Sequence, residues 1–137
     1  GIMPMFGIDA VHGHALLHGA TVFPSQLAMA CSFDEELVGK IGLATAKEVA
    51  ADGLDWVFSP VLCIGRDLRW GRVDETFGED TLVVSRLGAA MIRGYIIPRR
   101  LAAAPSLYLP VSVPRTWRYD PWSPATTFLL KSSSDRA

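Results

Sequence analysis

The sequence has 137 residues, half of them hydrophobic, and a net charge of −1. That length suits one small domain with a core, and the near-neutral charge argues against nucleic acid or an acidic surface as a partner. No apolar run reaches transmembrane length, so we expect no membrane partner. The chain opens at Gly1 without a basic segment, which predicts a cut end and no signal peptide. Localisation and oligomeric state stay open.

The two cysteines, Cys31 and Cys63, are too few for a disulfide framework. Both stand among apolar residues, which predicts two buried free thiols.

The first predicted element is a strand over residues 4–9. A short apolar run that ends in a turn signal is typical of a strand in a parallel sheet. Asp9 closes this run. It is therefore expected at the C-terminal end of the strand, where α/β folds place their chemistry.

A loop over residues 10–24 follows, and it contains His12, His14 and His18. Three imidazoles and a water would make a catalytic zinc site. The i, i+2, i+6 spacing, however, is not a recognised ligand pattern. We therefore expect these histidines to bond loop backbone and carboxylates, and we predict neither a metal nor another cofactor.

Residues 25–30 are expected to form a short helical turn, and a longer helix is expected over residues 34–51. Ser32 and Glu35 have the spacing of a capping box that starts this helix, and Asp52-Gly53 supplies its end. One apolar face is predicted for it. The residues of that face are Leu37, Val38, Ile41, Ala44, Thr45, Glu48 and Val49.

A second strand is expected over residues 54–60 and a second helix over residues 81–93, with Gly94 as its stop. Val83, Leu87, Ala90 and Met91 would face inward. The order is thus β-loop-α-β-loop-α. Helical crossovers of this length imply parallel strands, so both loops leave the same edge of the sheet. Asp9 and Arg72 are then expected to converge there.

The loop over residues 65–80 holds three arginines, five carboxylates, Trp70 and Phe77. A core could not bury so many charges unpaired. We expect a polar cleft with an aromatic wall, which suits a ligand rich in hydroxyls. Arginine and carboxylate side chains supply the donors and acceptors that a sugar needs.

Composition changes sharply near Gly94. Residues 1–94 hold all 12 glycines and a charge of −5, whereas residues 95–137 hold six of the nine prolines and a charge of +4. The second segment is expected to be an atypical tail, poorly ordered or wrongly packed. Its cluster of Trp117, Tyr119 and Trp122 could stack on single-stranded nucleic acid, but such clusters are more often adventitious, and we expect no nucleic-acid partner.

Four blocks are specific enough to suggest a family. They are Gly7-Ile8-Asp9-Ala10-Val11-His12-Gly13, Gly19-Ala20-Thr21-Val22-Phe23-Pro24, Arg66-Asp67-Leu68-Arg69-Trp70-Gly71-Arg72 and Glu75-Thr76-Phe77-Gly78-Glu79-Asp80. In order and spacing they resemble the N-terminal domain of glycoside hydrolase family 3, over residues 1–94. The resemblance implies an α/β fold that is part of a (β/α)8 TIM barrel. It also implies a β-glucoside or oligosaccharide as substrate.

The resemblance implies that Asp9 and Arg72 bind sugar hydroxyls, with the other charges of the 65–80 loop as structural support. Family members act as retaining glycosidases, in which one carboxylate attacks and a second carboxyl group serves as acid and then base. Their nucleophile follows a Lys-His pair, which this sequence lacks. Asp120 and Asp135 stand in no suitable context, so no catalytic residue is expected in this chain.

Several interpretations of function follow. The first is β-glucosidase-like hydrolysis by an intact parent protein, to which this chain contributes part of the sugar pocket. The second is an inactive fragment, a sugar-binding or interaction remnant, or an artefact of gene prediction. The tail would then stem from a shifted reading frame or a truncated prediction. A metalloenzyme that uses the three histidines forms a third class.

Overall fold

The computed structural model describes residues 4–96 and 102–103. In chain order its elements are β1 (Gly7–Ile8), α1 (Gln26–Ala30), α2 (Glu35–Ala51), β2 (Trp56–Val57), the 3-10 turn η1 (Val73–Glu75), α3 (Thr81–Ile96) and β3 (Ala102–Ala103). The predicted order of strands and helices is confirmed. Both predicted strands are shorter than expected, two residues each.

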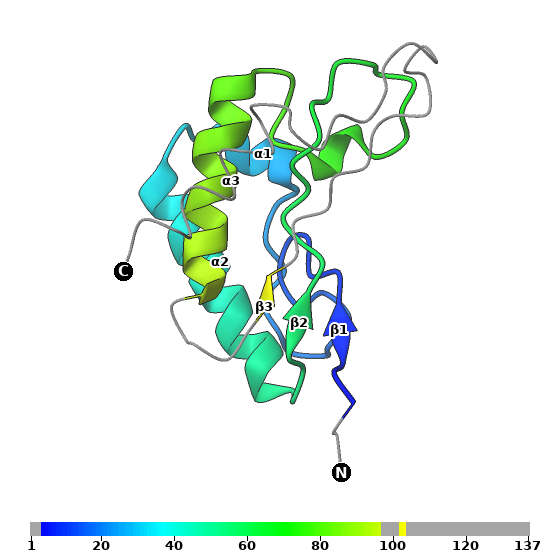
Figure 1. Cartoon of the computed structure of the whole chain (residues 1–137), viewed down its shortest axis with the longest axis vertical. Coiled ribbons are helices and arrows are strands. Elements are labelled where there is room, and N and C mark those ends of the chain that lie inside the picture. Colours follow the sequence, from blue (N-terminus) through cyan, green and yellow to red (C-terminus); the bar gives the residue numbers. More distant parts are fainter. Residues whose placement is uncertain (1–3, 97–101, 104–137) are drawn as a thin grey trace.

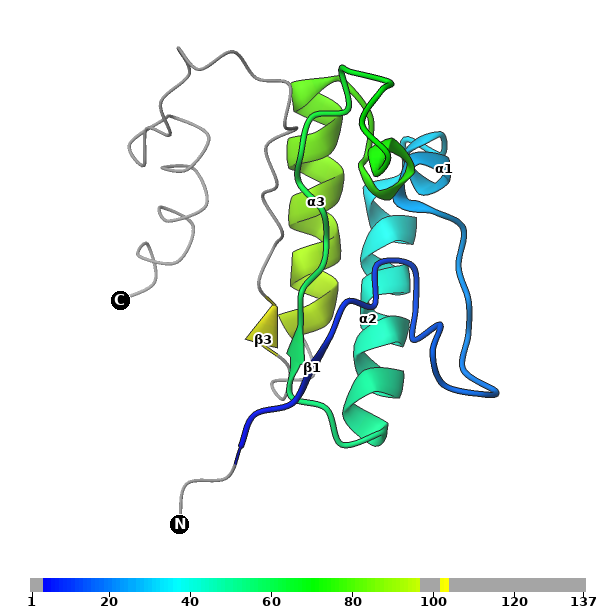
Figure 2. The same cartoon turned by 90° about the vertical axis from the view of Figure 1, so that its right-hand side faces the viewer.

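The three strands form one parallel sheet in the order β1-β2-β3. Gly7 pairs with Trp56 and Ile8 with Val57, and β2 continues the ladder to β3. Figure 1 shows the strand arrows pointing the same way, with α2 and α3 side by side on one side of them, and Figure 2 agrees. The parallel arrangement predicted from the helical crossover is therefore confirmed. A partial barrel stays a prediction.

The start of α2 differs from the predicted capping box. The N-cap is Asp34, whose Oδ1 accepts from the Leu37 amide at 3.0 Å. The Ser32 hydroxyl instead donates to the Met29 carbonyl at 2.7 Å and accepts from the Asp34 amide. Ser32 is thus used to end α1, so the cap moves two residues along the chain to the next side chain that can accept.

The predicted start of α1 and end of α2 are confirmed. Ser25 caps α1, with its hydroxyl accepting from the Ala28 amide. Asp52 is the C-cap of α2, and Gly53 follows with a φ of +81°. A positive φ is easy for glycine and strained for other residues, which is why the helix ends there.

The core lies between the two long helices and the strands. Its α2 stripe is rotated from the predicted one, since Leu37 is exposed while Gly42 and Ala46 are buried. On α3, Leu87, Ala90 and Met91 are buried as predicted, whereas Val84 rather than Val83 is the fully buried valine. The position of the neighbouring helix determines which residues are buried, and the apolar periodicity of a single helix does not contain that information.

Gly94 is not the stop of α3, which runs through it to Ile96. Instead, Gly94 faces α2 across a close backbone contact. A Cβ at this position would lie 2.3 Å from the Gly39 carbonyl oxygen and 2.8 Å from the Leu43 amide nitrogen. The residue is glycine because α2 and α3 approach too closely for a side chain.

The segment beyond residue 94 begins with regular structure. Tyr95 is buried within α3, and β3 pairs with β2. The rest of the predicted tail, including the aromatic cluster at residues 117–122, lies outside the described residues. The boundary at residue 94 stays a prediction.

Two further expectations concern the cysteines and the membrane. Cys63 is buried as predicted, but Cys31 is exposed, so the prediction for Cys31 was wrong. It stands at the end of α1, where its thiol donates to the Leu27 carbonyl at 3.5 Å. Within the described ranges, none of the helices has the length and apolarity that crossing a bilayer requires.

Candidate functional site

Asp9 leaves the sheet directly after β1. The Phe58 amide donates to the Ile8 carbonyl at 2.9 Å, which completes the ladder up to the residue before Asp9. The Asp9 side chain is exposed. The chain then turns at Ala10, which has a φ of +45°. This left-handed conformation is uncommon for a residue other than glycine, so the surroundings must hold it in place.

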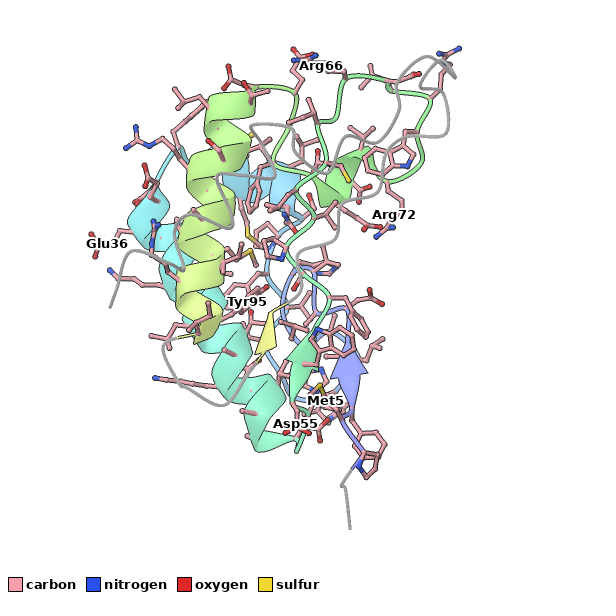
Figure 3. All side chains as sticks on the ribbon, viewed as in Figure 1. Met5, Glu36, Asp55, Arg66, Arg72 and Tyr95 are labelled. Atoms are coloured by element: carbon pink, nitrogen blue, oxygen red, sulfur yellow. The ribbon has the colours of Figure 1, made fainter. Side chains whose placement is uncertain are left out.

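Three oxygens meet beneath this turn. The Ser59 hydroxyl lies 3.2 Å from the Ala10 carbonyl oxygen and 2.9 Å from the Tyr95 hydroxyl, which is itself 3.5 Å from the same carbonyl. Both side chains are fully buried. Burial raises the pKa of Tyr95, an effect that its hydrogen bond with Ser59 opposes, so the phenol stays neutral. Figure 3 shows Tyr95 between α3 and the strands.

No sequence motif marks this cluster. The composition boundary places Tyr95 in the predicted tail, and Ser59 lies within the strand expected over residues 54–60. The available signal was a tyrosine within an apolar helical pattern, because a buried phenol needs a hydrogen-bonding partner. The partner itself, 36 residues away in sequence, could not be identified without the fold.

The segment over residues 10–24 is tied to the C-terminal part of α2. Buried His14 donates from Nε2 to Asp52 Oδ2 at 2.9 Å. One helical turn earlier, Glu48 accepts from the Thr21 amide at 3.0 Å and from the Thr21 hydroxyl at 2.7 Å. His12 bonds the Phe23 carbonyl through Nδ1 at 3.1 Å.

Two of the three histidines make the kinds of hydrogen bond that were expected of them. His14 bonds a carboxylate and His12 bonds loop backbone, as the non-metal interpretation predicted. His18 is exposed. In the part of the chain that the structure describes, no three His, Cys, Asp or Glu side chains are grouped as a metal ion would need.

The 65–80 loop is closed at its base, where the Gly65 amide donates to the Gly78 carbonyl at 2.9 Å. Val61 pairs with Thr76 in an isolated parallel bridge. On its other side, Val61 exchanges two bonds with the amide group of buried Gln26, at 3.0 and 3.3 Å. The loop is therefore anchored both to itself and to α1.

Within the loop, charges pair locally. Arg69 forks onto Asp67 at 2.7 and 2.9 Å. Arg72 donates from Nε to the two carboxylate oxygens of Glu75 at 3.0 and 2.9 Å, and also from Nη2. Both members of the second pair are half-buried. Figure 3 shows Arg72 beyond the C-terminal ends of β1 and β2, on the side away from the helices.

One of the two residues predicted to form the aromatic wall does not line the loop. Trp70 is half-buried in the loop, but Phe77 is a core residue with 2% of its surface exposed. Phe77 packs into the core cluster, and Gly78, with a φ of +108°, turns the chain directly after it. Asp9 and the Arg72 loop leave the same edge of a parallel sheet. Convergence of the two side chains on one ligand stays a prediction.

The chain is similar to enzymes that cleave sugars. A lysosomal β-glucosidase of Dictyostelium discoideum is 45% identical over 94 residues, which cover 68% of this chain and 11% of the enzyme. A β-xylosidase of Formosa agariphila is 39% identical over 99 residues, covering 69% of this chain and 14% of the relative.

The chain is also similar to solved structures of such enzymes. A β-glucosidase involved in saponin metabolism from intestinal bacteria superposes with a TM-score of 0.64 at 57% identity. The match covers 65% of this chain and 12% of that one. The chain thus spans only a small part, 11–14%, of the length of these proteins.

The family model described as the glycosyl hydrolase family 3 N-terminal domain matches residues 1–97. The match includes the exposed carboxylate after β1 and the whole 65–80 loop. This chain belongs to glycosyl hydrolase family 3, as part of its N-terminal domain.

Proposed function

We propose that this chain contributes part of the sugar pocket of a β-glucosidase-like hydrolase. In the intact parent, the reaction would remove non-reducing β-D-glucosyl residues by a retaining mechanism, in which two carboxyl groups lie about 5–5.5 Å apart. Glucose is preferred over xylose because a solved structure that is 57% identical to this chain is named a β-glucosidase. The β-xylosidase among the relatives keeps xylose as the alternative sugar.

One observation carries the proposal: parallel strands deliver Asp9 and the Arg72 loop to the same edge of the sheet. Asp9 presents an exposed carboxylate there. Arg72 has a half-buried guanidinium oriented by the Glu75 carboxylate. A carboxylate accepts from two vicinal hydroxyls, and a guanidinium donates to two more, so the pair matches the polar edge of a sugar ring.

We propose the same domain division that composition suggests, with residues 1–94 as a partial barrel domain and residues 95–137 as an atypical tail that is frame-shifted beyond residue 97, where the family match ends. The abrupt loss of glycine supports it. Translating the source nucleotide sequence in the other two frames tests it. A Lys-His pair followed by a barrel strand is expected in one frame, and its absence from both frames would refute the frame shift.

The competing function is an inactive remnant that binds no sugar. Glucose titration of the purified chain, followed by amide chemical shifts, separates the two. Saturable shifts are expected, and Asp9→Ala and Arg72→Ala should each abolish them. Asp55→Ala and Arg69→Ala are matched controls, since Asp55 directly precedes β2, at the opposite end of the sheet, and Arg69 is 85% exposed.

Hydrolysis of an aryl β-glucoside by the same chain is the second assay. We expect no turnover, because the residues that the family uses as nucleophile and acid have no counterpart in this sequence. Turnover that disappears in Asp9→Ala would contradict this expectation and would assign the chemistry to a carboxylate within the chain. Absence of glucose binding would favour the inactive remnant.

A further inference from the structure

We propose that Ser59 and Tyr95 are positioning residues, which hold the Ala10 carbonyl and thereby fix the orientation of Asp9. The inference rests on the proposed sugar-binding function of Asp9 and goes beyond it. It assigns a role to two buried hydroxyls that belong to different elements and that never touch the sugar.

The cluster has two hydroxyl hydrogens and three oxygens. If Ser59 donates to the Ala10 carbonyl at 3.2 Å, then Tyr95 donates to Ser59 at 2.9 Å. If the Ser59–Tyr95 bond runs the other way, Tyr95 donates to the Ala10 carbonyl at 3.5 Å. The carbonyl accepts a hydrogen bond in both arrangements, so the anchor survives either orientation of the hydroxyls.

Ala10, whose carbonyl accepts these hydrogen bonds, has a backbone conformation that requires support. Ala10 has a φ of +45°, a conformation that an alanine rarely adopts without support. Its peptide plane determines how the chain leaves β1, and Asp9 is the residue just before it. Fixing the Ala10 carbonyl therefore restricts the backbone from which the Asp9 carboxylate projects to solvent.

The two hydroxyls come from rigid parts of the fold. Ser59 stands two residues after β2, and Tyr95 stands in the last turn of α3. Each is fully buried, so water does not compete for these bonds. Gly94, the neighbour of Tyr95, allows α3 to pack close to α2. Helix packing is thus linked to the turn after Asp9.

A purely structural role for the cluster predicts a different result. Loss of a buried hydroxyl would then reduce stability without changing the Asp9 backbone or the sugar affinity. Thr45 supplies the control, since its buried hydroxyl donates to the Ile41 carbonyl at 3.0 Å within α2, away from Asp9. Thr45→Val removes a comparable buried bond.

The experiment compares Ser59→Ala, Tyr95→Phe and Thr45→Val in the full 137-residue chain. Backbone chemical shifts of residues 9–11 and the glucose dissociation constant are measured by NMR, and the urea midpoint is measured separately. Ser59→Ala and Tyr95→Phe should each displace the resonances of Asp9 and Ala10. Either hydroxyl can still donate to the Ala10 carbonyl when the other is removed. The double variant, Ser59→Ala with Tyr95→Phe, should therefore raise the glucose dissociation constant about fivefold, the worth of one hydrogen bond, and each single variant should raise it by less.

Thr45→Val should lower the urea midpoint and leave both readouts unchanged. The inference is overturned if the Asp9 and Ala10 resonances stay in place in Ser59→Ala and Tyr95→Phe, or if Thr45→Val moves them equally. If either Ser59→Ala or Tyr95→Phe fails to fold, the same measurements on the other variant test the inference. If wild-type chain binds no glucose while the resonances still move, the proposed function fails and the positioning of Asp9 stands.

Discussion

Gly94→Ala is the substitution for which the structure gives the sharpest stability prediction. The added methyl group would lie 2.3 Å from the Gly39 carbonyl oxygen, whereas ordinary contact begins near 3.4 Å. The two helices would have to separate by about 1 Å, which close-packed interiors resist. Both neighbouring atoms belong to backbone, so no side chain can rotate away.

The magnitude follows from two opposing terms. Replacing glycine by alanine inside a helix stabilises it by about 1 kcal/mol. Overpacking costs about 1–3 kcal/mol, and backbone contacts belong at the upper end of that range. We expect a net loss of about 1–2 kcal/mol, which lowers the urea midpoint by roughly 0.5–1 M at a typical slope of about 2 kcal/mol/M.

Gly39→Ala is the matched control on the facing helix. A Cβ at Gly39 would lie 3.5 Å from the Ala90 carbonyl oxygen, an ordinary contact. This variant should gain about 0.5–1 kcal/mol from helix propensity alone. Urea denaturation followed by circular dichroism measures both variants. If Gly94→Ala were as stable as Gly39→Ala, the close approach of α2 and α3 would be refuted.

Three further predictions follow from single contacts. Asp52→Ala should cost about 1–3 kcal/mol in urea denaturation, because it leaves the buried His14 imidazole without its partner. Glu75→Gln should weaken glucose binding severalfold in the NMR titration, since Arg72 loses its orienting charge, while stability changes by less than about 1 kcal/mol. The free energy of unfolding should fall above about pH 10, by at most about 1.4 kcal/mol per pH unit, because burial raises the Tyr95 pKa and only the unfolded phenol ionises there. Urea denaturation between about pH 8 and 11 should show this loss, and Tyr95→Phe should remove it.

Each of these predictions has a control. Asp55→Ala changes an exposed carboxylate three residues after Asp52 and should leave stability unchanged within about 0.5 kcal/mol. Glu36→Gln breaks an exposed ion pair with Lys40 on α2 and should not affect glucose binding. Equal effects in these controls would contradict the assigned contacts, and a pH dependence that persists in Tyr95→Phe would show that another group titrates.

Local signals predicted much of the fold. The glycine at position 53 ended α2 because its positive φ suits no other residue well. Ser25 started α1 through its own side chain. The parallel arrangement followed from the length of the connecting helix, which excludes a hairpin. In each case the deciding interaction lies within a few residues of the signal.

The errors had two sources, which are contacts between helices and competition between local hydrogen-bonding partners. Gly94 has the residue type of a helix stop, yet the reason for it is the backbone of α2. Ser32 matches a capping box, yet α1 uses its hydroxyl. Leu37 fits the apolar period, yet it is exposed, whereas Gly42 lies against Met91 of α3. A single sequence contains no information on which of two local partners a side chain will choose.

In the candidate site, too, some residues could be predicted from local motifs and others could not. Asp9 and Arg72 could be nominated because each stands in a compact motif, and the structure places them on segments that leave one edge of the sheet. The cluster beneath Asp9 could not be predicted. Ser59 and Tyr95 carry no motif, and their contact depends on α3 extending beyond Gly94.

The contacts of the 10–24 segment also have a dynamic consequence. His14 and Thr21 are bound to Asp52 and Glu48, one turn apart on the same helix. The segment that follows Asp9 therefore opens only when both carboxylate contacts break, so its amide hydrogen exchange should be limited by fraying of the C-terminal turns of α2. We therefore expect the segment after Asp9 to stay fixed in place rather than to open and close over a ligand.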